Sequence, residues 1–231
     1  MQTAPKVVQL KTESPAQSEA GGQFGRFVPQ AHARRTDISW HYGAPLSSVR
    51  EHLLHQRPAS LWLTGLSGAG KSTIAYALEK ILLERGHCSF VLDGDNLRHH
   101  LNSDLGFSPA DRRENIRRAA EVAHLMNEAG LIVITAFISP FQEDRAMARE
   151  IIGPDRFVEV YVSTAGKVCE ARDPKGLYAK ARRGEIPEFT GITSPYEAPQ
   201  EPDLEIDTEL LSTEAAAERL YYHLLGPCFS K

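Results

Sequence analysis

Cysteine is scarce in this chain, and its three cysteines do not form the pattern of a disulfide framework or a zinc site. Cys88, Cys169 and Cys228 are far apart, and no C-x-x-C pair occurs. Disulfide-stapled secreted domains and structural zinc sites need paired or clustered cysteines. We therefore expect reduced thiols in a reducing compartment, which favours a cytoplasmic protein.

Long apolar runs and an excess of positive charge are also missing. No run approaches the roughly 20 apolar residues of a membrane span, and the N-terminal sequence MQTAPKVVQL lacks the apolar stretch of a secretory signal. The first 35 residues hold few acids, which leaves organellar targeting open. The net charge is −4, whereas general nucleic-acid binders are usually basic. The composition argues against membrane and nucleic-acid partners, so any anionic ligand needs a local cluster of Arg and Lys.

Hydrophobic periodicity begins only after an N-terminal extension. Residues 1–37 are rich in Gln, Ala, Gly, Ser and Pro without a sustained pattern, and we expect them to be disordered. Within residues 38–231, short apolar runs alternate with segments that have one apolar face at helical spacing. The expected strands are Ser60–Thr64, Cys88–Leu92, Leu131–Ala136, Phe157–Val162 and Leu204–Ile206. Expected helices cover residues 71–85, the segment after Ser108-Pro109, and residues 213–225. This order predicts a doubly wound α/β domain with a mostly parallel sheet and helices on both faces.

A glycine-rich loop follows the first expected strand and precedes a helix. It matches the phosphate-binding motif G-x-x-x-x-G-K-[ST]. The expected ATP-binding residues are the eight of the motif and Thr73 after it: Gly65, Leu66, Ser67, Gly68, Ala69, Gly70, Lys71, Ser72 and Thr73. Glycines let successive backbone N–H groups point at one anion, and the helix N-terminus adds a favourable dipole. Lys71 is expected to reach the β- and γ-phosphates of ATP, and the Ser72 hydroxyl to ligate Mg²⁺. The loop predicts a nucleoside triphosphate site and leaves the phosphate acceptor open.

Two carboxylates, Asp93 and Asp95, stand at the end of the second expected strand, facing the expected triphosphate. One could orient or deprotonate an attacking hydroxyl, with Asp93 the first candidate, and one could hold Mg²⁺ through water. A plain loop with an Asx turn is the alternative.

Four arginines occur within seven residues, between Arg112 and Arg118, on an expected helix. Helical spacing places Arg112 and Asn115 on one face, and Arg113 and Arg117 on another. The cluster suits an anionic substrate, and a solvated face of paired charges is the alternative. We expect the helix to serve both purposes.

A basic stretch with several glycines and prolines covers residues 173–195 and includes Lys175. Such a segment is typical of a lid that closes over phosphates and excludes water. The alternative is a surface helix and loop without a ligand.

Several ordered motifs together resemble the adenylyl-sulfate kinase (APS kinase) family of P-loop enzymes, which make 3′-phosphoadenylyl sulfate in sulfate assimilation. They are GLSGAGKST, LDGDNLRHHL, DLGFSPADRRENIRR, TAFISP, EARDPKGLY, FTGI and SPYEAP. The resemblance implies an ATP-dependent kinase that uses Mg²⁺, acts on adenylyl sulfate and forms homodimers. The substrate contacts that it implies are Arg98, Phe107, Arg112, Asn115, Lys175 and Phe189. Of these, the two phenylalanines would sandwich the adenine of adenylyl sulfate.

Ser139 has two interpretations. It matches the family position described as a phosphoserine intermediate, so it counts among the catalytic candidates with Lys71, Asp93 and Asp95. Ser139-Pro140-Phe141-Gln142 also has the S-x-x-Q form of a helix-capping box. Direct in-line transfer needs no covalent intermediate, and we expect it here.

Two other function classes remain to be separated from this one. Another small-molecule P-loop kinase would lack the aromatic pair around a second purine. A nucleotide-dependent regulator would need no second anion site, and the N-K-x-D motif of guanine switches is absent.

Overall fold

The computed structural model describes residues 47–224 and 226, so the extension predicted for residues 1–37 lies outside the described part. Five strands form one sheet in the order β2-β3-β1-β4-β5, and every neighbouring pair is parallel. Their bounds are β1 Ser60–Thr64, β2 Ser89–Asp93, β3 Ile132–Ala136, β4 Phe157–Val162 and β5 Leu204–Ile206. All five expected strands are present within one residue of the predicted limits.

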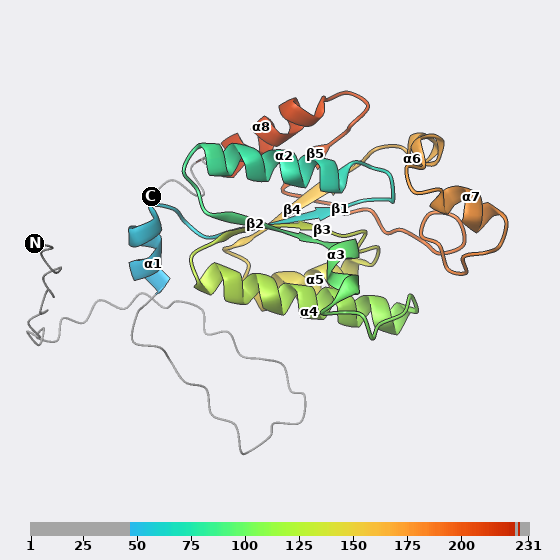
Figure 1. Cartoon of the computed structure of the whole chain (residues 1–231), viewed down its shortest axis with the longest axis horizontal. Coiled ribbons are helices and arrows are strands. Elements are labelled where there is room, and N and C mark those ends of the chain that lie inside the picture. The colour runs from blue at the N-terminus through green and yellow to red at the C-terminus, as the bar shows by residue number, and fades with distance from the viewer. Residues whose placement is uncertain (1–46, 225, 227–231) are drawn as a thin grey trace, which may run out of the picture. The chain divides into compact units, whose positions relative to one another are not determined.

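Helices cover both faces of this sheet, as the alternation of patterns predicted. The helices are α1 Ser47–Leu54, α2 Lys71–Glu84, α3 Gly94–His99, α4 Pro109–Glu128, α5 Gln142–Ile152, α6 Gly166–Arg172, α7 Leu177–Arg182 and α8 Thr213–Leu224. Figure 1 shows α2 and α8 on one face of the sheet and α4 and α5 on the other. Each face has its own hydrophobic cluster. The doubly wound α/β fold is confirmed.

The central strand β1 is buried at every position because helices cover both of its faces. Trp62 points to the α4–α5 side, where its ring stacks on Phe137 and Phe157 at centroid distances of 5.3 and 5.7 Å. The buried Ser60 hydroxyl donates to Asn127 Oδ1 at 2.8 Å, which satisfies a polar group that would otherwise be costly to bury. The strand that leads into the glycine-rich loop is therefore rigidly held.

The start of α4 follows the predicted capping pattern. Ser108 is the N-cap, its hydroxyl accepts from the Asp111 backbone N–H at 3.2 Å, and Pro109 occupies the first turn. The cap fixes where the helix begins and therefore which of its side chains face the sheet edge.

Two features bear on the composition-based expectations. Among the described residues, no helix is long and apolar enough to cross a membrane. Cys88 is exposed and Cys169 is buried, both as free thiols, whereas Cys228 lies outside the described part.

Candidate active site

A cavity of about 1060 Å³ opens at the carboxyl edge of the sheet. The segment at the carboxyl end of every strand contributes to the wall of this cavity, because the carboxyl ends of parallel strands share one edge of the sheet. One residue from the end of each strand or from the segment after it, taken in chain order from β1 to β5, is Lys71, Asp93, Ser139, Arg172 and Thr208. All the predicted site residues line the cavity except Gly65, Leu66 and Ala69.

The three exceptions act through their backbone. The Lys71 ammonium donates to the carbonyls of Gly65 and Leu66 at 2.9 and 2.7 Å. The Ala69 carbonyl accepts from the hydroxyls of Thr164 and Thr208 at 3.1 and 3.0 Å. These bonds fix the loop so that its N–H groups can face a common anion, as the motif predicts.

Glycine is required in this loop for space as well as for conformation. A Cβ on Gly65 would stand 2.5 Å from the Val162 carbonyl oxygen, and one on Gly68 would stand 2.9 Å from that of Cys169. Gly68 also has a φ of +76°, which side-chain-bearing residues rarely adopt. The loop therefore packs closely against β4 and α6.

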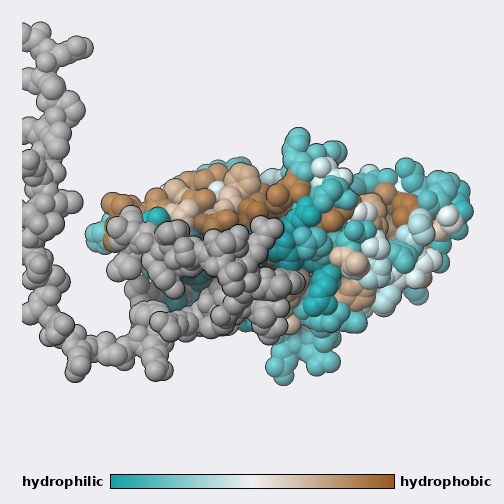
Figure 2. Space-filling model, turned by 90° about the horizontal axis from the view of Figure 1, so that it is seen from below, coloured by the Kyte–Doolittle hydropathy of each residue, from teal (hydrophilic) through white to brown (hydrophobic). Residues whose placement is uncertain are grey.

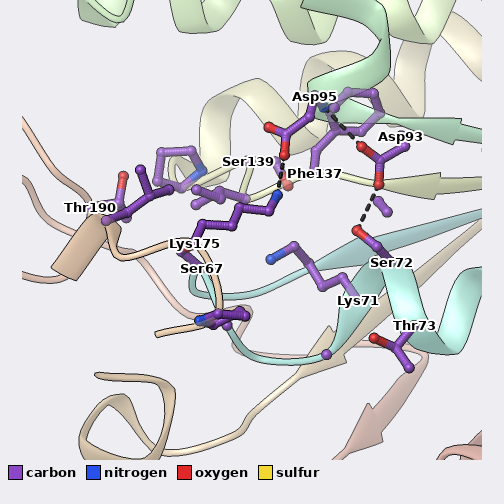
Figure 3. A pocket seen from close by; sticks show the side chains of 18 of the residues that line it. Ser67, Lys71, Ser72, Thr73, Asp93, Asp95, Phe137, Ser139, Lys175 and Thr190 are labelled. Atoms are coloured by element: carbon purple, nitrogen blue, oxygen red, sulfur yellow. Dashed lines mark hydrogen bonds and ion pairs between the residues drawn. The ribbon is translucent and has the colours of Figure 1, made fainter. Parts of the chain in front are cut away.

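Burial, with a smaller contribution from nearby Lys175, lowers the pKa of the Lys71 ammonium to about 8, against the opposing effects of Cys169, Asp93 and Asp95. A buried cation without a counter-anion is costly, so a triphosphate bound beside it would favour the charged form. Figure 3 shows Lys71 and Lys175 extending into the same space. The loop thus holds a cation that an anionic ligand would stabilise.

This pKa predicts how triphosphate affinity depends on pH. Above about pH 8 the free protein loses the Lys71 proton, so binding of ATP must take it up again. Affinity is expected to fall as pH rises, by up to about tenfold per pH unit, while the triphosphate itself stays fully ionised. Calorimetry in buffers of different ionisation enthalpy would measure the proton uptake. An affinity that is constant from pH 7 to 9.5 would contradict this assignment.

The two carboxylates at the end of β2 have different partners. Asp93 is buried; its Oδ2 accepts from the Ser72 hydroxyl at 2.6 Å, and its Oδ1 accepts from the Asp95 N–H at 2.9 Å (Figure 3). The second bond caps α3, so the Asx-type turn is present as well. Asp95 is exposed and forms an ion pair with Lys175 of the predicted lid. The pair connects the lid to the end of β2.

A divalent cation fits the Ser72–Asp93 pair. A hydroxyl and a carboxylate are the hard oxygen donors that Mg²⁺ takes in phosphate-binding sites, usually with phosphate oxygens and water. No cluster of three His, Cys, Asp or Glu side chains that could hold a metal by themselves occurs among residues 47–224. The pair therefore suits a cation that arrives with the triphosphate.

On the acceptor side, two guanidinium groups lie near the Phe107 ring. The Cζ atoms of Arg98 and Arg112 lie 4.4 and 5.9 Å from its centroid. Burial lowers the pKa of both arginines, and Arg98 lowers that of Arg112 further. The buried Asn115 lies on the same wall. Two partly buried cations this close favour an anionic ligand.

Arg112 also binds the lid. Its guanidinium donates to the Phe107 carbonyl at 2.9 Å, to Thr190 Oγ1 at 3.1 Å and to the Glu188 carbonyl at 2.7 Å. By contrast, Arg113 pairs with Glu143, and Arg117 with Glu114. The helix therefore has one side that lines the cavity and another that carries ion pairs, in agreement with the faces that the spacing predicted; ligand binding by the first side remains a prediction.

Ser139 does not cap a helix, so the capping-box interpretation is wrong. Helix α5 begins at Gln142, and its N-cap Phe141 makes no side-chain cap bond. Glu197 Oε2 instead accepts from the Gln142 N–H at 2.8 Å, which satisfies the helix start from a distant segment. Ser139 is buried with a φ of +38°, and its Oγ accepts from Trp62 Nε1 at 3.2 Å.

Sequence reasoning missed some residues of this site. Arg172 and Thr208 line the triphosphate side and bond to each other at 2.7 Å. Thr208 could have been found, because it follows the last strand and all strand ends meet at one edge. Arg145 is buried and donates to the Ser139 carbonyl at 2.8 Å and to Glu159 Oε1 at 2.7 Å. No sequence signal marks that contact.

The comparison with known families decides the identity of this arrangement. The family model of adenylylsulphate kinase matches residues 57–207, a range that includes the glycine-rich loop, both carboxylates, the arginines and the lid. The chain belongs to the adenylylsulphate kinase family. The predicted family resemblance is thereby confirmed.

Individual adenylyl-sulfate kinases agree with this assignment. The enzyme of Vibrio cholerae is 59% identical over 174 residues, which make up 75% of this chain and 81% of that protein. The structure of Mycobacterium tuberculosis APS kinase in complex with AMPPNP and APS is 50% identical, has a TM-score of 0.70, and covers 73% of this chain and 98% of that one. A hexameric APS kinase from Thiobacillus denitrificans is 35% identical, with a TM-score of 0.56. The match covers 76% of this chain and 29% of that one.

Proposed function

We propose that this chain transfers the γ-phosphoryl group of ATP to the 3′-hydroxyl of adenylyl sulfate, giving 3′-phosphoadenylyl sulfate and ADP. The observation that carries the proposal is that two arginines and two phenylalanines line the same cavity as the phosphate-binding loop. Arg98 and Arg112 would hold the anionic phosphosulfate, and Phe107 and Phe189 its adenine. Guanidinium forks match such oxygens, and aromatic faces hold a purine ring at little entropic cost.

Positioning and charge stabilisation provide most of the catalysis in phosphoryl transfer. Lys71 and the N–H groups of the glycine-rich loop bind the transferred phosphate, and Lys175 adds charge from the lid. Asp93 is the first candidate for orienting the acceptor hydroxyl and taking its proton at a carboxylate oxygen, and Asp95 is the second. Ser72 would hold Mg²⁺ directly and Asp93 would contact it through water, so that the Asp93 carboxylate can still act on the acceptor hydroxyl; the ion, when bound, would neutralise charge on the phosphate oxygens.

Direct transfer is favoured over a phosphoserine intermediate by the surroundings of Ser139. An activated serine needs a base that accepts its proton. Within the described residues, the one hydrogen bond found at Ser139 Oγ comes from the Trp62 indole, which is a donor. No carboxylate or imidazole in that part of the chain accepts from it.

A coupled ADP-release assay with adenylyl sulfate, set against a panel of other nucleotides and sugars, tests the function. In the presence of ATP, we expect turnover with adenylyl sulfate and with no other acceptor of the panel. The 3′-phosphorylated product should form together with ADP. Faster turnover with a sugar would instead indicate another small-molecule kinase. ATP binding without turnover on any acceptor would indicate a nucleotide-dependent regulator.

The aromatic residues separate the two nucleotide sites. Replacing Phe107 or Phe189 by alanine is expected to weaken adenylyl sulfate binding more than ATP binding. Each substitution should cost roughly 1–3 kcal/mol of the free energy of adenylyl sulfate binding. Phe107 is 59% exposed and Phe189 only 7%, so Phe107→Ala leaves folding less disturbed and is the cleaner test. Calorimetry with each ligand measures the difference. Equal losses for both ligands would mean that the rings support the lid in general.

We also propose a homodimer. The related Thiobacillus denitrificans protein is described as hexameric, and large hydrophobic side chains are exposed at Leu53, Phe90 and Leu125. Figure 2 looks from the side of α4 and α5 and shows hydrophobic surface beside hydrophilic regions. Analytical ultracentrifugation would measure the subunit number.

A further inference from the structure

Tyr178 lies in the lid helix α7 and is 3% exposed, yet it does not line the cavity. It belongs to the hydrophobic cluster that also contains Phe189, with Leu66 and Ile192 packed against it. This cluster joins the lid to the glycine-rich loop. Its members come from both nucleotide sites, and Tyr178 contacts each site through a different part of its side chain.

The ring of Tyr178 contacts the acceptor side. It meets Phe189 edge to face, with centroids 4.9 Å apart and an interplanar angle of 74°, a favourable geometry for an aromatic pair. The hydroxyl contacts the triphosphate side, where it donates to the Ser67 carbonyl at 3.0 Å. The Tyr178 side chain therefore connects Phe189 to the phosphate-binding loop. Its ring is rigid, and it has only two rotatable bonds.

The Ser67 carbonyl is well placed to control phosphate binding. This carbonyl and the Gly68 N–H belong to one peptide plane, and the plane is rigid. A donor that fixes the direction of the carbonyl therefore fixes the direction of the N–H, which is one of those that the loop presents to a phosphate. Ser67 and Gly68 both line the cavity.

The surrounding contacts leave little room for the two ends to move independently. Both Asp173 carboxylate oxygens accept backbone N–H groups of α7, from Tyr178 and Ala179, at 3.0 Å each. A Cβ on Gly191, just after Phe189, would stand 3.0 Å from the Leu66 side chain. Because cores are close-packed, a shift of Phe189 is transmitted to its neighbours.

We propose that Tyr178 is a positioning residue that couples occupation of the acceptor site at Phe189 to the geometry of the phosphate-binding loop at Ser67. The inference rests on the proposed function, since it takes adenylyl sulfate as the acceptor ligand. A nucleotide stacked on Phe189 holds the Tyr178 ring, and its hydroxyl then holds the loop in its binding geometry. Each ligand consequently tightens the binding of the other, as thermodynamic reciprocity requires.

Two variants separate the ring from the hydroxyl. Tyr178→Phe keeps the contact with Phe189 and removes the bond to Ser67. Tyr178→Leu removes both. The matched control is Tyr221→Phe, because Tyr221 is also buried in this cluster, lies in α8 and does not line the cavity. The Arg85 Cζ lies 4.0 Å from its ring centroid, so this substitution keeps the ring contact and removes only a hydroxyl. Thermal unfolding of all three variants reports any general loss of stability.

The experiment measures the affinity of a non-hydrolysable ATP analogue with and without adenylyl sulfate, and steady-state kinetics for each protein. For Tyr178→Phe we expect near-normal affinity for each ligand alone, loss of the mutual tightening, and a fall in kcat of about three- to tenfold, the range that one net hydrogen bond supports. Tyr178→Leu should also raise the KM for adenylyl sulfate, and phenylalanine should restore that KM without restoring kcat. Tyr221→Phe should keep the wild-type coupling.

The coupling role would be overturned if Tyr178→Phe kept the mutual tightening, or if the wild-type protein showed none. In either case, turnover of adenylyl sulfate by the wild-type protein would leave the proposed function in place. An equal loss of coupling in Tyr221→Phe would overturn it too, by showing a general effect of cluster stability. A wild-type protein that binds ATP but does not turn over adenylyl sulfate would overturn the proposed function and this inference together.

Discussion

Replacing Lys71 by alanine is expected to abolish phosphoryl transfer and to leave the domain folded. The ammonium is the cation nearest the expected β- and γ-phosphates, and loss of one such preorganised group typically costs about 10²–10³-fold in rate. Folding should survive because burial lowers the pKa of Lys71 to about 8, which shows that the charged form is destabilised without its ligand. Removing it relieves that cost.

The measurement is single-turnover ADP formation, with thermal unfolding as the check on folding. Lys71→Arg serves as the matched control, since it keeps a charge but cannot donate with the same geometry to the carbonyls of Gly65 and Leu66. We expect Lys71→Arg to be strongly impaired as well, because a compact ammonium is needed in this space. Wild-type turnover by Lys71→Ala would disprove the assignment of the phosphate-binding loop.

The parts of the molecule that the sequence predicts well are those built from local patterns. The glycine-rich loop is a continuous run of residues between a strand and a helix, and the structure places it at the carboxyl end of β1. The cap at Ser108 and the two faces of α4 likewise depend on spacings of three or four residues. Parallel strands then bring these local motifs together, because their carboxyl ends share one edge.

The parts that the sequence does not predict depend on contacts between distant segments. The S-x-x-Q pattern at Ser139 predicted a cap, but Glu197 supplies the acceptor for the start of α5. Arg145 and Tyr178 bond to backbone carbonyls, and a carbonyl leaves no trace in the identity of its residue. Such bonds are invisible to pattern reasoning even where the flanking motifs are correctly recognised.

A second large effect is expected at Arg112, which we place against the anionic part of the acceptor. Removing one member of a charge pair in a partly dry site typically costs 2–5 kcal/mol, since the other charge is left unpaired. Arg112→Ala should therefore lower kcat/KM for adenylyl sulfate by about 30- to several-thousandfold. It also removes the bonds to Thr190 and Glu188, so part of the loss comes from a looser lid.

Two variants resolve these contributions. Arg112→Lys keeps a positive charge but lacks the planar fork that reaches Phe107, Thr190 and Glu188 together. Arg113→Ala, one position further along α4, removes a half-exposed arginine that pairs with Glu143, and should stay near normal. An Arg112→Ala protein with near-normal kinetics would remove the strongest residue from the acceptor site.

Ser139→Ala should behave differently from Arg112→Ala, and the comparison decides between direct transfer and a covalent intermediate. With direct transfer, alanine removes the acceptor of the buried Trp62 N–H, which typically costs about 1–3 kcal/mol of stability, and a measurable fraction of activity remains. With a phosphoserine intermediate, alanine leaves nothing to carry the phosphoryl group, and the loss is several orders of magnitude. Steady-state kinetics with circular dichroism on both variants gives the answer. A Ser139→Ala protein that folds, binds both substrates normally and has no activity would overturn our preference for direct transfer.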